Sequence, residues 1–323
     1  MAVIIDGTRI AEEIRAEVRK EAGELKKERG ITPGLAVILV GENPASQVYV
    51  NSKVKACGQV GIHSETILKP EEATTEEVLR DIELLNQRED IHGILVQLPL
   101  PKQIDENLVL PAVDPSKDVD GFHPVNVGKL CLKQEGFVPA TPSGIIEILK
   151  RMNIQIEGKE AVVIGRSDIV GKPMALLLLH HNATVTVCHS RTVDLPGVAR
   201  RADILVVAIG RPAMVKGDWV KPGAVVIDVG TNRVTADKAW EELKKDPKRA
   251  KNLGTRGSTL VGDVDEYSVG PVAAYRTPVP GGEGPLSMAM HLKNTLLAAL
   301  TFGKKKEEIQ LDGNLLSPGL REG

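Results

Sequence analysis

Short, largely apolar runs recur along this chain, and a helical or turn segment follows each of them. The runs lie at residues 35–40, 91–98, 161–164, 184–187, 204–209 and 224–229. A strand that is apolar at nearly every position is buried on both faces, as it is in a parallel sheet that helices cover on both sides. The alternation of such strands with helices predicts an α/β fold.

The helices between these runs have recognisable starting signals. An apolar stripe at helical spacing runs over residues 10–25. Asn43 is a suitable cap for a helix that begins at Pro44, since proline is favoured at the first helical position. Thr74 and Glu77 have the spacing of a capping box ahead of a further apolar stripe. These signals indicate that the strand–helix alternation begins in the first third of the chain.

The last four runs repeat the pattern of a nucleotide-binding, doubly wound sheet. A loop rich in Asp, Pro and Gly at residues 114–126 and a helix at 143–152 precede them, and a final helix is expected at 285–300. We therefore predict two α/β domains with a cleft between them, the second built on a Rossmann-like, doubly wound parallel sheet. The expected divisions are residues 1–142 plus 285–302, residues 143–284, and a polar tail at 303–323.

Residues 235–257 form a charged insertion between two of the predicted elements. We expect a solvated surface segment with one short helix at 238–245, which Asp246 and Pro247 would end.

Composition argues against several classes of protein. A net charge of -2 and an aromatic content of 2% offer neither the basic field nor the stacking platforms of a nucleic-acid-binding protein. The three cysteines are far apart and the seven histidines are scattered, so neither a disulfide framework nor a metal site is expected. No basic segment with a long apolar stretch opens the chain, and no apolar run is long enough to cross a bilayer. We expect a cytoplasmic protein without a membrane anchor.

A dinucleotide site is predicted where the strand at 161–164 meets a glycine turn and a helix. Gly165 would allow the tight turn, and Gly171 would allow close backbone approach at the helix start. The spacing is not GxGxxG, so the turn taken alone is as compatible with a structural role. The run that follows ends in Ser190 and Arg191 without the acid that would hold an NAD ribose. Because Arg191, Ser190 and Arg166 suit a 2′-phosphate, NADP is favoured over NAD.

Two further groups of residues are candidates for chemistry. Tyr49 and Lys53 are spaced to share one helix face, although a single helical lysine is most often solvated. Gln97 ends a buried strand, where it could simply satisfy the backbone. Asp120 lies in a loop that turn-forming residues would also explain.

Taken together, six segments resemble the bifunctional methylenetetrahydrofolate dehydrogenase/cyclohydrolase family. They are YVNSK at 49–53, GILVQLPLP at 93–101, KDVDGFHPVN at 117–126, GRSDIVGKP at 165–173, CHSRT at 188–192 and TPVPGG at 277–282. They occur in the family's order and extend over roughly residues 1 to 300.

The resemblance implies oxidation of 5,10-methylenetetrahydrofolate by NADP⁺ and hydrolysis of the methenyl product to 10-formyltetrahydrofolate, by a homodimer with folate in the cleft. It assigns acid–base chemistry to Lys53, positioning to Tyr49 and Gln97, and the pterin to Asp120. The implied substrate contacts are Tyr49, Gln97, Leu98, Asp120, Pro280 and Gly281. The implied cofactor contacts are Gly165, Arg166, Ser167, Gly171, Pro173, Ser190 and Arg191.

One position departs sharply from the family pattern, because Glu283 stands where relatives usually carry valine. An unpaired buried carboxylate would cost on the order of several kcal/mol. Glu283 could pair with Lys53 and damp hydrolysis, face the nicotinamide, or point to water. Two alternatives to the bifunctional enzyme follow: a dehydrogenase with impaired hydrolysis, and a non-catalytic folate- or nucleotide-binding protein.

Overall fold

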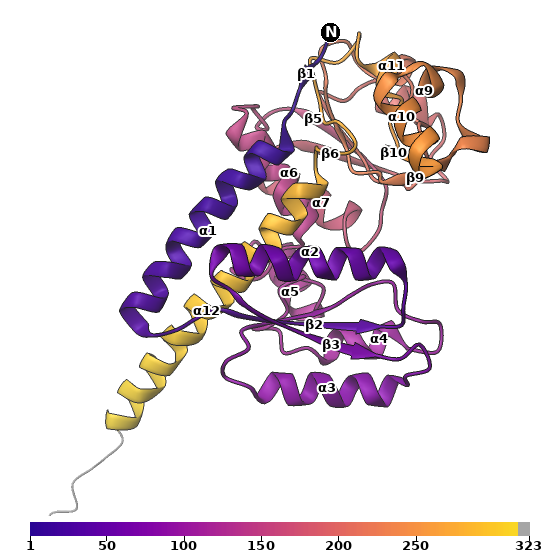
Figure 1. The fold of residues 1–323 in the computed structure, drawn as a ribbon. Coiled ribbons are helices and arrows are strands. Elements are labelled where there is room, and N and C mark those ends of the chain that lie inside the picture. Colours follow the sequence, from indigo (N-terminus) through magenta and orange to yellow (C-terminus); the bar gives the residue numbers. More distant parts are fainter. Residues whose placement is uncertain (316–323) are drawn as a thin grey trace, which may run out of the picture. The chain divides into compact units, whose positions relative to one another are not determined.

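The computed structural model describes residues 1–315, with side chains through Phe302 except that of Ala45. The chain divides into two compact units, described separately below. Unit 1 comprises Met1–Glu13 and Val127–Met290, and unit 2 comprises Ile14–Asn126 and His291–Gly323. Helices α1 (Gly7–Arg29), α5 (Pro124–Cys131) and α12 (Gly284–Leu315) pass from one unit into the other (Figure 1).

Unit 1 is built on a six-stranded parallel sheet in the order β1-β11-β8-β7-β5-β6. Its strands are β1 (Val3–Ile4), β5 (Glu160–Ile164), β6 (Thr184–Cys188), β7 (Ile204–Val207), β8 (Val225–Asp228) and β11 (Tyr275–Arg276). Since β6 and β7 flank β5 on opposite sides, the strand order reverses at β5. Ligands of doubly wound sheets bind beyond the carboxyl ends of the strands at such a reversal. The predicted doubly wound sheet is confirmed.

Helices connect these strands, and apolar side chains from both fill the core of unit 1. The connecting elements are α6 (Ala140–Arg151), α7 (Gly171–His180), α8 (Leu195–Ala199), η2 (Gly217–Trp219) and α11 (Glu266–Val269). Val162, Leu205 and Val226, from three neighbouring strands, are at most 2% exposed and belong to one apolar cluster. Burial of every position in β7 and β8 explains why these strands read as continuous apolar runs.

The charged insertion folds differently from the prediction. It contains η3 (Ala236–Lys238), α9 (Glu241–Lys245) and α10 (Pro247–Arg256), and the paired strands β9 (Asn232–Thr235) and β10 (Ser258–Val261) flank it. Helix α9 ends at Lys245, before Asp246 and Pro247, as predicted. Pro247 also begins α10, which Asp246 caps by accepting from the Arg249 amide at 2.9 Å. The expectation of a single helix in a solvated segment was wrong, because α10 follows α9 and apolar side chains of the segment are buried. The insertion and its flanking strands share a small apolar core, made of Val234, Ala239, Leu243, Leu253 and Val261.

Unit 2 contains a three-stranded parallel sheet in the order β3-β2-β4. The strands are β2 (Gly34–Val40), β3 (His63–Lys69) and β4 (Gly93–Val96). Helices α2 (Pro44–Val60) and α3 (Thr75–Gln87) connect them, and α4 (Glu106–Val109) and η1 (Leu110–Ala112) follow β4. Figure 1 shows α2 and α3 on opposite sides of this sheet. The capping box of Thr74 and Glu77 is present at the start of α3, as predicted.

Several boundaries differ from the expected ones. The predicted loop at 114–126 ends earlier, since α5 begins at Pro124. Helix α6 begins at Ala140, three residues before the expected start, and α12 continues to Leu315 instead of ending near residue 300. The final residues of the predicted polar tail, 316–323, lie outside the described residues. Among the described residues, no helix is both long and apolar enough to cross a membrane.

Candidate active site

A buried amine lies at the centre of the candidate site in unit 2. Lys53 is only 3% exposed on α2, and its Nζ donates to Oε1 of Gln97 over 3.1 Å. Gln97 follows β4, and its own Nε2 donates to the Leu98 carbonyl over 2.7 Å, which fixes the orientation of the amide. Tyr49 precedes Lys53 by one turn, and its ring centroid lies 5.4 Å from Nζ, within cation–π range. The predicted cluster of Tyr49, Lys53 and Gln97 is therefore assembled.

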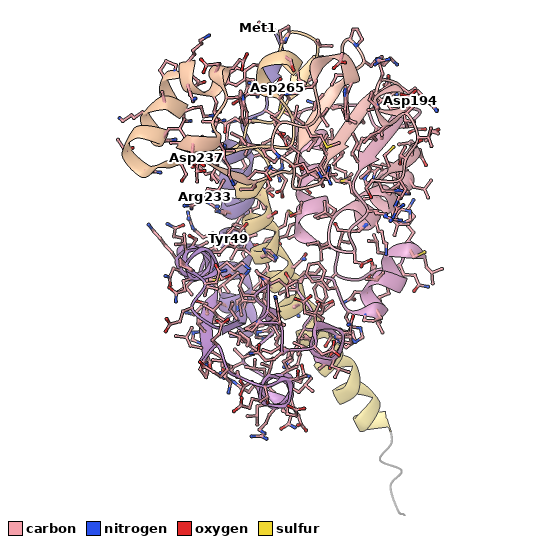
Figure 2. The ribbon with its side chains drawn as sticks, turned by 90° about the vertical axis from the view of Figure 1, so that its right-hand side faces the viewer. Met1, Tyr49, Asp194, Arg233, Asp237 and Asp265 are labelled. Carbon is pink, nitrogen blue, oxygen red and sulfur yellow. The ribbon has the colours of Figure 1, made fainter. Side chains whose placement is uncertain are left out.

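Burial lowers the pKa of Lys53, while the negative charge of Asp120 acts in the opposite direction. Desolvation disfavours an ammonium, and the amide oxygen of Gln97 holds Nζ without contributing a compensating charge. The side chain is thus suited to proton exchange instead of serving as a solvated surface cation. Tyr49, labelled in Figure 2, remains 42% exposed.

A second aspartate builds the loop that carries Asp120. Both oxygens of Asp118 are engaged: Oδ1 accepts from the Gly121 and Phe122 amides, and Oδ2 accepts from the His123 amide and from Asn126. Burial raises the pKa of Asp118, and these donors partly oppose that effect. Asp118 therefore fixes the loop, which leaves Asp120 available for other contacts.

Asp120 has a neighbour that sequence reasoning missed. Nε2 of His291, on α12, lies 2.8 Å from Oδ1 of Asp120. One turn further along α12, Nδ2 of Asn294 donates to the Val119 carbonyl over 2.8 Å. Because 171 positions separate His291 from Asp120, no local pattern signals their contact.

The predicted dinucleotide turn has the expected geometry in unit 1. Gly165 adopts φ +130°, and a Cβ there would approach the Ala208 carbonyl oxygen to 2.2 Å. At the start of α7, a Cβ on Gly171 would lie 2.3 Å from the Gly165 carbonyl oxygen. The Ser167 hydroxyl accepts from the Gly171 amide over 3.3 Å, which ties the turn to the helix start. Both glycines are therefore required by the backbone, as predicted.

A solvent-open depression of about 300 Å³ lies where the strand order reverses. The segments that follow three strands line it: Gly165 and Arg166 after β5, His189 and Ser190 after β6, and Ala208, Ile209 and Arg211 after β7. Of the predicted cofactor residues, Gly165, Arg166 and Ser190 thus line one hollow. Ser167, Gly171, Pro173 and Arg191 are not among its lining residues, although Ser167 and Gly171 shape its turn.

Asp263 supports one wall of this depression and was also missed. It is fully buried, and its carboxylate accepts from the backbone amides of Ile209, Gly210 and Arg211 over 2.7–2.9 Å. Asn232 donates to the same carboxylate over 2.8 Å. The three backbone amides tie the segment after β7 to this carboxylate, and Arg211 adds a cation to the wall that the sequence did not suggest.

Glu283 lies in the turn before α12, and it is buried, at 7% exposure. Its carboxyl accepts a hydrogen bond from Ser287, whose Oγ lies 2.5 Å from Oγ1 of Thr141. Burial raises the pKa of Glu283 to about 7, against the opposing effect of these two hydroxyls. Of the three alternatives for Glu283, the one in which it points to water is wrong, because the side chain is buried and hydroxyls from α6 and α12 lie around its carboxyl.

The fold and these sites define a class: an α/β protein with a dinucleotide-type turn at the sheet reversal and a separate buried lysine site. Comparison with known proteins identifies the family within that class. Residues 5–120 match the catalytic domain of tetrahydrofolate dehydrogenase/cyclohydrolase, and residues 139–302 match its NAD(P)-binding domain. The chain belongs to the tetrahydrofolate dehydrogenase/cyclohydrolase family, which confirms the resemblance of its motifs.

Individual relatives agree along nearly the whole chain. A bifunctional protein FolD of Koribacter versatilis is 57% identical over 300 residues, covering 93% of this chain and 97% of the relative. The crystal structure of the bifunctional enzyme from Campylobacter jejuni superposes with a TM-score of 0.85 at 45% identity, covering 93% and 99% of the two chains. The Trypanosoma brucei enzyme, solved with NADP and an inhibitor, gives a TM-score of 0.84 at 41% identity, covering 93% and 98%.

Proposed function

We propose that this chain oxidises 5,10-methylenetetrahydrofolate with NADP⁺ and hydrolyses the resulting methenyl cation to 10-formyltetrahydrofolate. The observation that carries the proposal is the buried Lys53 held by Gln97, in a chain whose family is dehydrogenase/cyclohydrolase. A buried lysine whose pKa is lowered is typical of a functional site, whereas most lysines without a catalytic role are solvated.

In the hydrolytic step, Lys53 acts on the attacking water. Water adds to the cationic carbon of the methenyl group and loses a proton, which Nζ accepts if it is uncharged. Burial favours that uncharged form, and the positive charge of the substrate favours it further. Gln97 keeps Nζ in place through its amide oxygen in both protonation states. As the ring opens, Nζ gives this proton to the leaving ring nitrogen, and the hydroxyl of the tetrahedral intermediate loses its own proton to water as the formyl carbonyl forms, so that one proton is released overall.

Asp120 supplies the contact that orients the pterin. A carboxylate presents two acceptor oxygens, which match the two N–H donors on the aminopyrimidine edge of a pterin. Asp118 saturates its own oxygens with loop donors, so Asp120 is the carboxylate of this loop with acceptor capacity to spare. Leu98, Pro280 and Gly281 remain proposed substrate contacts on the resemblance alone.

The residues of unit 1 fit a phosphorylated dinucleotide. The turn at Gly165 and the start of α7 offer backbone amides to the diphosphate, and their glycines leave room that a Cβ would fill. Arg166, Ser190 and the exposed Arg191 provide donors for a 2′-phosphate. Ser167 and Pro173 complete the proposed set, through the turn and the first turn of the helix. When bound, NADP⁺ supplies the hydride acceptor for the oxidation.

The two alternatives remain distinguishable by experiment. Ser287 and Thr141 already engage the Glu283 carboxyl, so nothing observed favours a dehydrogenase whose hydrolysis Glu283 impairs. Absorbance is followed after mixing the chain with methylenetetrahydrofolate and NADP⁺. Reduced cofactor without lasting methenyl absorbance supports both activities. Accumulating methenyl indicates a dehydrogenase alone, and no change indicates a folate or nucleotide binder.

We further propose that the chain acts as a homodimer in the cytoplasm, with tetrahydrofolate derivatives as its partners and without a nucleic-acid or membrane partner. The resemblance of its motifs supports the dimer, and the composition supports the rest. The domain division expected from the sequence likewise stays a prediction. Sedimentation of the purified chain at micromolar concentration tests the dimer, and a monomer would contradict it.

A further inference from the structure

Two side chains of α12 hold the loop that carries Asp120. His291 contacts the Asp120 carboxylate, and Asn294 donates to the Val119 carbonyl. Residues three apart on a helix lie on one face, so both side chains extend toward the same loop. Helix α12 therefore contacts the Val119 carbonyl and the Asp120 carboxylate, which belong to adjacent loop residues. Asp120 is the proposed pterin ligand.

The two aspartates of this loop differ in how fully their oxygens are used. Asp118 accepts four hydrogen bonds, two at each oxygen. Among the described residues, His291 is the only group that hydrogen-bonds the Asp120 carboxylate, and it does so at Oδ1. An ionised carboxylate has roughly four acceptor sites. Asp120 is thus anchored at one oxygen, with capacity at both for two ligand donors.

The hydrogen bond between His291 and Asp120 is largely shielded from solvent, which strengthens it. The side chains of His291 and Asp120 are only 12% and 11% exposed. An ionised carboxylate can only accept, so the ring nitrogen of His291 that faces it carries a proton. Without this donor, the carboxylate of Asp120 could rotate about its side-chain bonds. Ligand binding would then have to immobilise the carboxylate, and the lost conformational entropy would weaken binding.

We propose that His291 is a positioning residue for folate recognition, which presents the Asp120 carboxylate to the aminopyrimidine edge of the pterin. The inference rests on the proposed function, because it takes Asp120 as the pterin ligand. His291 touches neither the reacting carbon nor the cofactor in this scheme. A change at His291 should therefore alter the affinity for folate and leave the rates of oxidation and hydrolysis largely unchanged.

Two substitutions separate the hydrogen bond from packing. His291→Leu removes the donor at similar size, whereas His291→Gln places an amide nitrogen where Nε2 lies. We expect His291→Leu to raise KM for methylenetetrahydrofolate about tenfold, the size of one lost charge-assisted hydrogen bond. We expect kcat to change less than about threefold and KM for NADP⁺ to stay unchanged, since the donor acts on substrate binding alone. His291→Gln should restore most of the lost affinity.

Controls keep the outcome specific. His63→Gln makes the same replacement at an exposed residue of β3 and should leave all constants unchanged. If His291→Leu fails to fold, His291→Asn serves instead, since its shorter amide cannot reach the Nε2 position. An unchanged KM for folate in the donor-free variant overturns the inference. A loss that His291→Gln does not restore, or that falls equally on kcat, overturns it as well.

The proposed function and this inference fail in different ways. Calorimetric titration with 5-formyltetrahydrofolate measures binding without turnover. A wild-type chain that neither turns over nor binds this folate contradicts the proposed function. A wild-type chain that binds it, beside a His291→Leu chain that binds it equally well, contradicts only the role of His291.

Discussion

Replacing Glu283 by glutamine should stabilise this protein in a pH-dependent way. The free energy of unfolding of the variant, measured relative to that of wild type, should be larger at neutral and alkaline pH than at acidic pH. The change removes an ionisable group and keeps an oxygen that can accept from Ser287. Burial raises the pKa of Glu283 from an ordinary value of 4.5 to about 7. The folded chain therefore holds this proton up to a higher pH than the unfolded chain does, and unfolding releases it. The stability that the protonated carboxyl contributes is complete below pH 4.5 and is lost as the pH rises toward 7.

The size of the effect follows from the two pKa values. Each pH unit between them changes the free energy of unfolding by about 1.4 kcal/mol, and the change levels off above the pKa of the folded state. Between about pH 5 and pH 8, Glu283 should therefore cost wild type roughly 2–3 kcal/mol that the glutamine variant does not lose. The carboxyl is nearly inaccessible to solvent, so screening by water reduces this figure little.

Urea denaturation followed by circular dichroism, at both pH values, measures the difference. The quantity of interest is the gap in free energy of unfolding between Glu283→Gln and wild type, because other titrating groups cancel in it. A Glu42→Gln variant, at an exposed position of unit 2, is the matched control and should show no pH-dependent gap. A gap for Glu283→Gln that is equal at the two pH values, within about 0.5 kcal/mol, would refute the argument that burial keeps this carboxyl neutral.

Three further substitutions test the two sites. Lys53→Met should lower the hydrolytic rate at least about a hundredfold, so that methenyl absorbance accumulates during oxidation; hydrolysis at the wild-type rate would contradict its role as base. Arg191→Ala should raise KM for NADP⁺ about tenfold and leave KM for NAD⁺ unchanged, and steady-state kinetics with both cofactors decide whether it meets the 2′-phosphate. Asp263→Asn should raise KM for NADP⁺ and lower the melting temperature, because an amide cannot accept from all four donors that the carboxylate holds. Unchanged cofactor kinetics in a folded Asp263→Asn protein would show that the wall does not depend on it.

The central strands could be predicted from sequence because burial leaves a clear pattern. Every residue of β7 and β8 is buried, so both appear as apolar runs. The two-residue strands β1 and β11 carry no such signal, since they are short and their residues are exposed or half-buried. At Pro247 the sequence signal is present but ambiguous. Proline both ends and begins helices, and only the hydrogen bond from the Arg249 amide to Asp246 identifies the start of α10.

Only the site residues that lie within the family-like motifs could be predicted from the sequence. Lys53 and Gln97 lie in segments that resemble the family, and the structure joins them by a hydrogen bond. Asp263 and His291 act on partners 52–54 and 171 positions away. Contacts of that kind depend on tertiary packing and leave no local period or spacing. Glu283 was noticed from the sequence, yet its surroundings were not, because the two enclosing hydroxyls come from different helices.

The opposing effects of burial and of Asp120 on Lys53 suit the proposed role of this lysine as a base that is uncharged when substrate is present. Burial lowers the pKa of Lys53, and the carboxylate of Asp120 partly restores it. With the proposed pterin in place, the N–H donors of the ligand engage that carboxylate and the cationic carbon adds a positive charge near Nζ. Both changes lower the pKa of Lys53 further, since each weakens the stabilisation of an ammonium. Gln97 suits this arrangement better than an acid would, because a carboxylate hydrogen-bonded to Nζ would hold the lysine charged throughout. In this scheme the carboxylate of Asp120, the proposed pterin ligand, also influences the charge state of Lys53, the proposed base.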